Sequence, residues 1–361
     1  MKVLIVHPQF YLYGGGELVI KELSDYLDRN NVEHDILTSK MISEVRKGFE
    51  GKNVIIPHEI FERKRRYADI MCDWVREHKD DYDVINYHNH PVQLISKFVP
   101  HANVWQCNEP SPEGIQGKPG VAEVECAQRY LDNIIVFDEY NAMRCNRLYD
   151  VNPIVNYYGI NHKFFSGGDA QVATDKYKLY DDFVVLHAAM IHPEKGQLES
   201  VKAISELKDK IPNIRLLLVG WDHHQYADRL REIISSNKLS DKIQIYPHIP
   251  RTDLINLYAR ADVLVQPCTD HGGWLVPFEA LSAKLPVIVS ETMTSSPIIR
   301  ENHFGVVSND LVKSIQDVKK QYAYYKNRAK KASKWIKTNL TWDKYGDTYM
   351  ETFKDSIEKR K

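Results

Sequence analysis

Short apolar runs alternate with amphipathic stretches of helical period along the first half of the chain. The periodic stretches predict helices at Glu17–Arg29 and near Asp69–His78. The apolar runs predict strands at Val3–Val6, His34–Leu37, Val54–Ile56, Asp83–Tyr87, Val104–Cys107 and Ile134–Phe137. Alternation of this kind is typical of parallel sheets whose strands are joined by crossover helices.

The same alternation starts again in the second half. Strands are predicted at Phe183–Ala188, Arg215–Val219, Lys242–Tyr246, Val263–Gln266 and Val287–Val289, and helices at Gln197–Leu207, Ala227–Asn237, Thr252–Arg260 and Glu279–Lys284. The chain has 361 residues, more than one hydrophobic core usually supports. We therefore expect an α/β protein of two doubly wound, Rossmann-like domains. Phe165–Asp169 is rich in small and polar residues and suits the linker, which places the domains at 1–166 and 167–341.

Composition narrows the classes of partner and compartment. The formal net charge is −1, so nothing favours nucleic acid as the main partner. The five cysteines lack CxxC spacing, which argues against a disulfide framework and favours a reducing cytoplasm. The first apolar run is too short for a signal peptide, and no window approaches the roughly 18 to 20 apolar residues that span a bilayer. Any membrane contact is expected to be peripheral, on the inner face.

One basic segment is a candidate for such contact. Between Lys313 and Lys337 the only acid is Asp317, and aromatic residues are interspersed among the lysines and arginines. The segment could dock on anionic lipid head groups. The simpler interpretation is a solvated helix whose aromatic face packs on its own domain.

A glycine loop, Gly14–Gly16, follows the first predicted strand and precedes the first helix. Its backbone amides and the positive end of the helix could approach an anion or a sugar hydroxyl. The spacing is not GxGxxG, which disfavours a dinucleotide site. A tight turn with a purely structural role is the alternative.

Two stretches of the second half carry groups suited to a diphosphate. Lys195-Gly196 follows a strand, where the ammonium could neutralise phosphate charge. Gly272-Gly273 precedes a helix whose amides could stabilise a leaving group, and Glu279 within it could accept hydrogen bonds from vicinal hydroxyls. A surface lysine and a carboxylate that interacts with the helix dipole are the simpler interpretations.

These stretches resemble the donor site of family-4 retaining glycosyltransferases, in which Glu-x7-Glu precedes a Pro-Val-Ile strand. Tyr158–Phe164 is similar to the hinge of that family, and Leu217–Gly220 and Leu257–Val263 are similar to its later elements. The resemblance covers nearly the whole chain. It implies the GT-B fold, with an N-terminal acceptor-binding domain and a C-terminal donor-binding domain facing each other across a cleft. A final helix, at about 342–361, would pack back on the first domain.

The resemblance also implies roles for individual residues. His88, Lys195 and Glu279 would be catalytic, with His88 facing the transferred sugar, Lys195 on the diphosphate and Glu279 on the ribose. The donor would be bound by Gly15, Gly16, Lys195, Tyr246, His248, His271, Gly272, Gly273, Trp274, Leu275, Val276 and Glu279. The acceptor would be bound by Asn89, His90, Asn108 and Glu109. A mobile lid is expected at Gly114–Gly120.

The donor motif departs from the family pattern at several positions. His271 replaces the first glutamate, Met190 replaces an arginine, and Lys284 replaces a usual glycine. Thr294–Ile298 replaces a glycine-rich segment that contains Pro-Glu. The identity of the donor sugar therefore cannot be inferred from the family resemblance.

No metal and no cofactor are expected besides the nucleotide-sugar co-substrate. The His223-His224 pair has no third ligand in register, and Asp81-Tyr82-Asp83 immediately precedes a strand, which favours a loop role for Asp81. The predicted reaction transfers a sugar with retention to a hydroxyl of a glycan or a lipid-linked acceptor, in a pathway such as polysaccharide biosynthesis. A nucleotide-sugar epimerase of the same fold and a weakened glycan-binding or scaffold relative are the alternatives.

Overall fold

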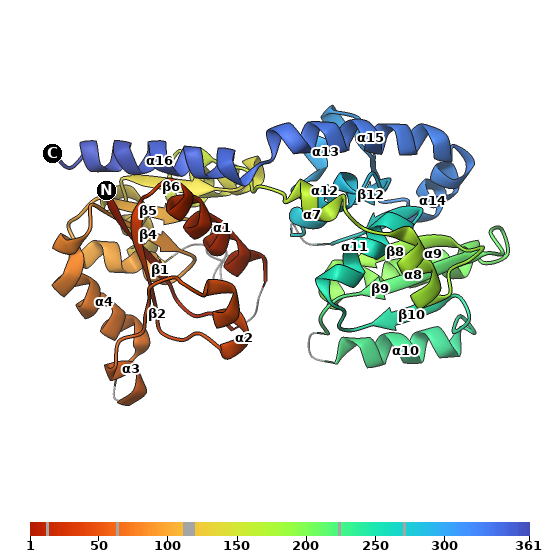
Figure 1. Ribbon diagram of the computed structural model, residues 1–361, viewed down its shortest axis with the longest axis horizontal. Helices are drawn as coiled ribbons and strands as arrows, with labels where there is room; N and C mark the ends of the chain where they lie inside the picture. The colour runs from red at the N-terminus through yellow and green to blue at the C-terminus, as the bar shows by residue number, and fades with distance from the viewer. Residues whose placement is uncertain (12–13, 63–64, 111–119, 223–224, 270–271) are drawn as a thin grey trace. The chain divides into compact units, whose positions relative to one another are not determined.

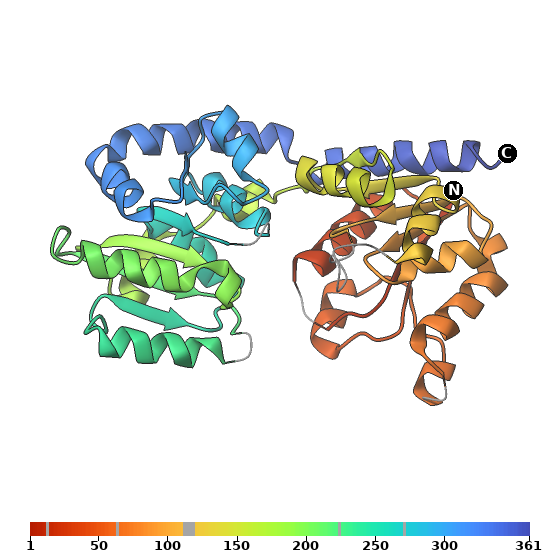
Figure 2. The same cartoon turned by 180° about the vertical axis from the view of Figure 1, so that it is seen from behind.

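The computed structural model describes residues 1–11, 14–62, 65–110, 120–222, 225–269 and 272–361. The chain forms two compact units. The first consists of Met1–Gly159 together with Trp342–Lys361, and the second is the continuous segment Ile160–Thr341. Each unit is a parallel sheet covered by helices (Figures 1 and 2).

The first unit is built on a parallel sheet with the strand order β3-β2-β1-β4-β5-β6-β7. Its strands are β1 (Lys2–His7), β2 (Glu33–Thr38), β3 (Val54–Ile55), β4 (Val84–His88), β5 (Asn103–Gln106), β6 (Asn133–Val136) and β7 (Ile154–Val155). Its helices are α1 (Gly15–Arg29), α2 (Ser43–Arg46), α3 (Glu59–Glu62), α4 (Tyr67–His78), α5 (Val121–Arg129), α6 (Glu139–Tyr149) and α16 (Trp342–Glu358), with 3₁₀ segments at Lys47–Phe49, Lys79–Asp81 and Val92–Phe98.

The two faces of this sheet are covered by different helices. Leu4, Ile85 and Tyr87 pack with residues of α4, α5 and α6 in one apolar core. The other face contacts α16, the last helix of the chain. Gly346 of α16 lies so close to the Tyr26 ring of α1 that a Cβ at this position would be 2.2 Å from a ring carbon. The end of the sequence is therefore part of the first unit.

The second unit has the strand order β10-β9-β8-β11-β12-β13, again parallel. Its strands are β8 (Phe183–Ala188), β9 (Ile214–Val219), β10 (Ile243–Tyr246), β11 (Val263–Gln266), β12 (Val287–Val289) and β13 (Val306–Val307). Its helices are α7 (His162–Phe165), α8 (Ala170–Tyr177), α9 (Gln197–Leu207), α10 (Tyr226–Ser236), α11 (Arg251–Arg260), α12 (Leu275–Ser282), α13 (Ser296–Glu301), α14 (Leu311–Lys320) and α15 (Tyr322–Asn339), with a 3₁₀ turn at Pro193–Lys195.

The core of the second unit lies between its sheet and the helices α9, α10 and α14. Val185, Leu216 and Val265 contribute from the strands, and Ile204 and Ile315 from helices α9 and α14. The strands are mostly apolar because helices cover both faces of a parallel sheet. For this reason the bounds predicted for β8 and β11 agree with those of the structure.

Two predictions about chain organisation need adjustment. The first unit ends at Gly159, seven residues before the expected boundary at 166. The reason is that α7 packs against α11, α12 and α15, so the residues after Gly159 already belong to the second unit. The basic segment 313–337 is divided between α14 and α15 at Gln321, rather than forming one helix.

Candidate functional site

In each sheet the direction of strand progression reverses at one point. The reversal lies between β1 and β4 in the first unit, and between β8 and β11 in the second. Ligands of open α/β sheets bind beyond the carboxyl ends of the strands at such points. The glycine loop follows β1, His88-Asn89 ends β4, Lys195-Gly196 follows β8, and Gly272-Gly273 follows β11.

The turn that contains Lys195 is held against the end of β11. Gly196 has φ +77°, and a Cβ at this position would be 2.0 Å from the carbonyl oxygen of Pro267. The amide of Thr269 donates to the carbonyl of Glu194 at 2.9 Å. The position therefore requires glycine, and the contact brings the half-buried Lys195 beside the segment that follows β11.

Gly273 forms the second glycine turn. Its φ is +83°, and a Cβ would be 2.9 Å from the Met293 methyl group. Helix α12 begins two residues later, at Leu275, and its N-terminus is anchored by Trp274, whose buried ring lies 4.6 Å from that of Phe278. Amide groups at the start of α12 are thus close to the carboxyl ends of β8 and β11. Asp270 and His271 lie outside the described residues.

Glu279 is buried in α12, with 8% of its surface exposed. The Tyr258 hydroxyl of α11 donates to Glu279 Oε2 at 3.0 Å. Burial raises the pKa of Glu279, although Arg251 and the Tyr258 hydrogen bond act in the opposite direction. Sequence reasoning assigns Tyr258 only to a helix and misses this contact, because its partner lies 21 residues away in another helix.

Tyr246 and His248 lie at the end of β10, two strands away from β8 in the sheet. The Tyr246 ring is half-buried against Tyr177, with 5.0 Å between the ring centroids. His248 is exposed. The structure therefore places these two residues at the same sheet edge as Lys195, but on its outer side.

In the first unit, the glycine loop lies close to two asparagine side chains. A Cβ on Gly16 would be 3.8 Å from Asn89 Nδ2 and 3.9 Å from Asn108 Nδ2. Asn108 Nδ2 donates to Asn89 Oδ1 at 2.5 Å. The Gly14 amide donates to the Glu17 carboxylate, at 3.1 Å. The predicted residues Gly16, Asn89 and Asn108 thus come together at the switch point.

A chain of hydrogen bonds that begins at a buried tyrosine fixes the orientation of Asn108. Tyr349 of α16 donates to Gln106 Oε1 at 2.5 Å, and Gln106 Nε2 donates to Asn108 Oδ1 at 2.9 Å. Tyr158 also donates to Asn108 Oδ1, at 2.7 Å. Sequence reasoning misses Gln106, Tyr158 and Tyr349 as supporting residues, since no local pattern connects the last helix of the chain with β5.

His88 is completely buried. Its Nε2 is 2.7 Å from Asn86 Oδ1, and its ring is stacked on Tyr349 at 6.3 Å. Burial, together with the neighbouring His7, lowers the pKa of His88 well below its usual value. Its Nδ1 has no hydrogen-bond partner among the described residues. A role facing the transferred sugar stays a prediction.

The other predicted acceptor residues lie at the same edge. His90 Nδ1 is 2.9 Å from Gln93 Nε2 and 3.5 Å from the Glu123 carboxylate. Glu109 is exposed, directly after Asn108. Residues 114–119 of the predicted lid lie outside the described part of the chain.

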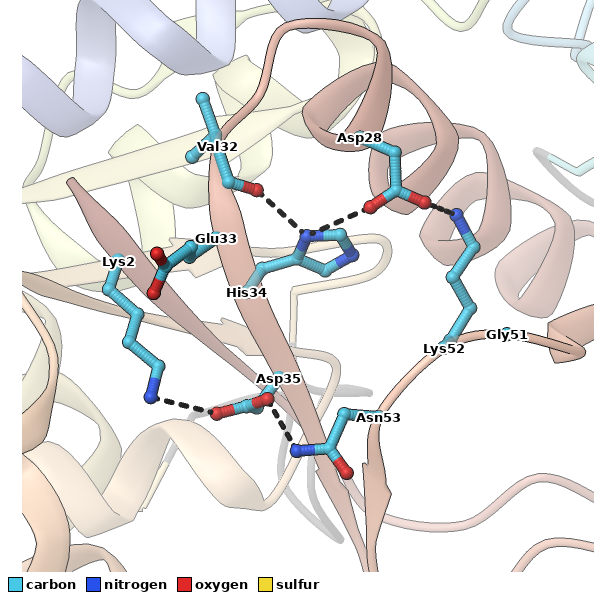
Figure 3. A pocket seen from close by; sticks show the side chains of 9 residues that line it. All are labelled: Lys2, Asp28, Val32, Glu33, His34, Asp35, Gly51, Lys52 and Asn53. Atoms are coloured by element: carbon cyan, nitrogen blue, oxygen red, sulfur yellow. Dashed lines mark hydrogen bonds and ion pairs between the residues drawn. The ribbon is translucent and has the colours of Figure 1, made fainter.

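A polar pocket of 330 Å³ lies at the opposite ends of the strands, where β1 and β2 begin (Figure 3). Its charged side chains are paired with one another. Lys2 Nζ is 3.4 Å from Asp35, Asn53 Nδ2 donates to Asp35 at 2.6 Å, and Lys52 pairs with Asp28. Burial raises the pKa of Asp35, but hydrogen bonds from Tyr82 and Asn53 outweigh it, so that the pKa is lowered. We interpret this pocket as an ion network that fixes β2 and β3.

Nothing in the described residues forms a metal site or a membrane span. No group of three or more His, Cys, Asp or Glu side chains in the described ranges could hold a metal ion. Asp83 accepts a hydrogen bond from the Lys2 amide at 2.7 Å, which is a structural role. His223 and His224 lie outside the described residues. None of the described helices is both long and apolar enough to cross a bilayer.

Comparison with known proteins gives matches in sequence and in structure. Residues 172–339 match the family model of glycosyl transferases group 1. The chain is 26% identical over 140 residues to a GDP-mannose-dependent α-(1-6)-phosphatidylinositol monomannoside mannosyltransferase of Mycolicibacterium smegmatis, a match that covers 37% of this chain and 36% of the relative. It is 23% identical over 326 residues to a D-inositol 3-phosphate glycosyltransferase of Kineococcus radiotolerans, which covers 77% and 73%. The chain spans less than half the length of the mycobacterial mannosyltransferases that it matches.

Solved structures are similar to the chain over almost its full length. HepE of Anabaena, crystallised with UDP, has a TM-score of 0.81 at 17% identity and covers 98% of this chain and 100% of its own. WaaG, a glycosyltransferase of lipopolysaccharide biosynthesis, has a TM-score of 0.76 at 16% identity, with 96% and 98% covered. These likenesses establish the fold. Residues 172–339 therefore form a domain of the glycosyl transferases group 1 family, on a chain with the GT-B fold.

Proposed function

We propose that this protein is a retaining glycosyltransferase that moves a sugar from a nucleotide-sugar to a hydroxyl of a glycan or lipid-linked acceptor. One observation carries the proposal. Lys195 and Gly273 follow β8 and β11, the two strands at the switch point of the second sheet, and the buried Glu279, which accepts from Tyr258, lies in α12, which begins two residues after Gly273. A cation, helix-terminal amides and a carboxylate are the groups needed for diphosphate and ribose recognition.

Each group has a separate task in the proposed reaction. The bond between the anomeric carbon and the diphosphate oxygen breaks, and the electron pair leaves with the diphosphate. Lys195 and the amides at the start of α12 stabilise the charge that develops on this leaving group. The acceptor oxygen forms the new bond on the same face of the sugar, and its proton passes to the departing diphosphate oxygen. Glu279 holds the ribose hydroxyls and fixes the donor in place.

In the first unit, the Asn89–Asn108 pair and the glycine loop supply hydrogen-bonding groups for the acceptor and for the transferred sugar. Asn108 is held by two donors, Gln106 and Tyr158, so its orientation is restricted before a ligand arrives. Preorganised polar groups of this kind lower the cost of ordering on binding.

The names of the relatives support this class of donor. HepE was crystallised with UDP and with UDP-glucose, and the mycobacterial relatives are described as GDP-mannose-dependent. The two nucleotide bases differ, so the base recognised by this chain is open to direct measurement. We also propose that neither a metal ion nor a further cofactor takes part, because Lys195 and amide dipoles serve the diphosphate.

A thermal-shift screen against UDP-, GDP- and ADP-sugars tests the proposal. A ligand at 100 times its dissociation constant should stabilise the fold by about 2.7 kcal/mol. Lys195→Ala should remove most of this shift, whereas Lys202→Ala, at an exposed position of α9, should leave it unchanged. If no nucleotide-sugar stabilises the protein, the donor-site assignment is wrong.

Product analysis separates the transferase from its alternatives. Transfer to an acceptor with the anomeric configuration kept, and unaffected by EDTA, agrees with the proposal. Release of a free epimer would indicate an epimerase, and binding without turnover across acceptor panels would indicate a scaffold or glycan-binding role. No contact in the described structure favours either of these alternatives.

Peripheral membrane contact and a cytoplasmic location stay predictions. The outer face of α15 exposes Lys330, Lys331, Lys334 and Lys337, a spacing that puts them on one side of the helix. We propose that this face associates with anionic lipid. Sedimentation with phosphatidylglycerol vesicles, but not with phosphatidylcholine vesicles, is the expected result, and exchange of the four lysines for glutamine should abolish it.

A further inference from the structure

An apolar groove of 580 Å³ lies on the first unit, between α4 and the 3₁₀ segment Val92–Phe98. Tyr67, Ala68 and Cys72 line it from α4, and Leu94 and Ile95 line it from the other side. Its volume is within the range of about 300 to 1,000 Å³ that is usual for small-molecule pockets. No group proposed for the transfer reaction lies in it.

The groove is adjacent to the proposed acceptor residues. Pro91, which lines it, directly follows Asn89-His90, and Gln93 of the same segment contacts His90 Nδ1 at 2.9 Å. A molecule in the groove would therefore extend toward the Asn89–Asn108 pair.

The rim carries one exposed aromatic ring and one arginine. Phe98 at the edge of the groove is 58% exposed. The Arg66 side chain, which also lines the groove, is 85% exposed and pairs with Asp69 at 2.9 Å. Asp69 also lines the groove and accepts from both Nε and Nη2 of Arg66, but solvent screens this exposed pair, so the guanidinium is still able to contact a second anion. An arginine fork is well suited to a phosphate.

We propose that this groove binds the apolar chain of a lipid-linked acceptor, with the phosphate of the lipid at Arg66 and the sugar end at Asn89 and Asn108. The inference rests on the proposed transferase function and narrows the acceptor to an amphiphile with an anionic head. The apolar lining matches a hydrocarbon chain, and Arg66 supplies a cation for the phosphate beside it. The volume fits a single small molecule, which favours a lipid chain over a docked protein.

Binding of n-decyl phosphate to the full-length protein, measured by calorimetry below its critical micelle concentration, tests the groove. We expect saturable binding of decyl phosphate, weaker binding of n-decyl maltoside, and none of inorganic phosphate at the same concentration. Equal binding of the two decyl compounds would show that Arg66 does not recognise the phosphate. Binding of inorganic phosphate, without binding of decyl phosphate, would show that the groove does not bind a hydrocarbon chain.

A variant whose side chain fills the groove provides a second test of the proposal. Ala68→Trp places a large ring at a half-buried groove position, and we expect it to weaken decyl phosphate binding at least tenfold. Glu77→Trp, at an exposed position of the same helix, is the matched control and should bind like the unmodified protein. Circular dichroism establishes that both variants are folded. Unchanged binding by Ala68→Trp overturns the proposal.

The donor screen distinguishes the two possible failures. If nucleotide-sugars stabilise the protein and decyl phosphate does not bind, the proposed transferase function is supported and the lipid acceptor is ruled out. If decyl phosphate binds and no nucleotide-sugar does, the groove is supported as a lipid site and the proposed transfer reaction is ruled out.

Discussion

The carboxylate of Glu279 is buried, and among the described residues its hydrogen-bond donor is the Tyr258 hydroxyl. A buried charge of this kind is unfavourable for folding, which is why its pKa is raised. In the proposed donor site, the ribose hydroxyls would complete the hydrogen bonds of this carboxylate. We therefore expect the charge of Glu279 to lower the folding stability of the unliganded protein and to raise its affinity for the donor.

Glu279→Gln tests this opposition. The neutral amide should raise the free energy of unfolding of the unliganded protein at pH 7, since it no longer buries a charge. The same change should weaken donor binding by about 1.5 to 3 kcal/mol, the usual contribution of hydrogen bonds to a charged group. Chemical denaturation without ligand and calorimetry with the donor measure the two effects. Glu206→Gln, at an exposed position of α9, should alter neither.

The ionisation of Glu279 also gives donor binding a pH dependence. Because the pKa is raised, protonation begins at a higher pH than for an ordinary glutamate. Donor affinity should fall as the pH decreases through this pKa, while the burial penalty on folding is relieved over the same range. A donor affinity that is the same on both sides of this pKa would contradict the assigned role.

His187 of β8 makes the second unit sensitive to acid. Burial lowers its pKa to about 3, and its Nδ1 is 2.9 Å from the Ser200 hydroxyl. The unfolded state takes up the proton at about pH 6.5, whereas the folded state stays neutral. Stability is therefore full above pH 6.5 and falls as the pH decreases toward 3, by about 1.4 kcal/mol at pH 5.5.

His187→Gln keeps a hydrogen-bonding group for Ser200 and removes the titration. The loss of stability between pH 7.5 and 5.5, measured by urea unfolding, should be smaller by about 1.4 kcal/mol than in the unmodified protein. The comparison uses the difference between the two pH values, so a general loss of stability in the variant does not affect it. An unchanged difference would mean that His187 is protonated in the folded state.

Single residues of the site can be predicted where a motif marks them, whereas their partners cannot. Lys195, Gly273 and Glu279 follow strands or lie at the start of a helix in a recognisable order. Tyr258 and Gln106 act through contacts that only tertiary packing creates. Lys284 shows the physical basis of one departure: its φ of +63° is the left-handed conformation in which glycine is favoured.

At the scale of elements, the sequence predicts strands better than helices. Fully buried parallel strands such as β8 are runs of mainly apolar residues, a pattern that surface helices and loops rarely produce. Helix α12 is predicted from Glu279 but begins at Leu275, because proline at position 277 is tolerated in a first turn. Helices α5 and α6 are absent from the prediction. Helix α5 buries two residues and α6 buries three, so neither has a long apolar stripe that would mark it in the sequence.

Because a hydrogen-bond chain connects α16 with Asn108, we expect the Tyr349 hydroxyl of α16 to affect acceptor binding. Tyr349→Phe leaves Gln106 Oε1 without its donor, which should cost about 1 to 3 kcal/mol of stability. Asn108 then loses part of its orientation, so the KM for the acceptor should rise while the KM for the donor stays the same. Steady-state kinetics with each substrate varied in turn measures this.

Tyr82→Phe is the matched control for Tyr349→Phe. Its buried hydroxyl donates to Asp35 at 2.7 Å, in the ion network at the other end of the strands. The loss of stability should be similar, with no change in the KM for either substrate. If both variants raise the acceptor KM equally, the effect of Tyr349 is general destabilisation.

At the scale of the whole molecule, the two units differ in how the chain builds them. The second is one continuous segment, whereas the first needs α16 from the end of the sequence. The buried face of α16 includes Tyr345, Tyr349 and Phe353, which cover one face of the first sheet. Removal of α16 should therefore damage the first unit and spare the second.

A chain ending at residue 341 tests this division. We expect the first unit to lose cooperative unfolding and resistance to protease, while a segment close to 160–341 stays protected and keeps its nucleotide-sugar thermal shift. Limited proteolysis with mass spectrometry identifies the surviving segment. Loss of donor binding together with the first unit would show that the second unit depends on it.

The position of α16 also sets an order of events during synthesis. N-terminal domains usually fold first as a chain emerges from the ribosome, at about 5 to 20 residues per second. Here the first unit is completed only after the second unit has been translated, because α16 follows that unit in the sequence. For roughly 10 to 40 seconds β4 and β5 lack the helix that contacts them in the finished fold, so we expect the first unit to need chaperones over this interval.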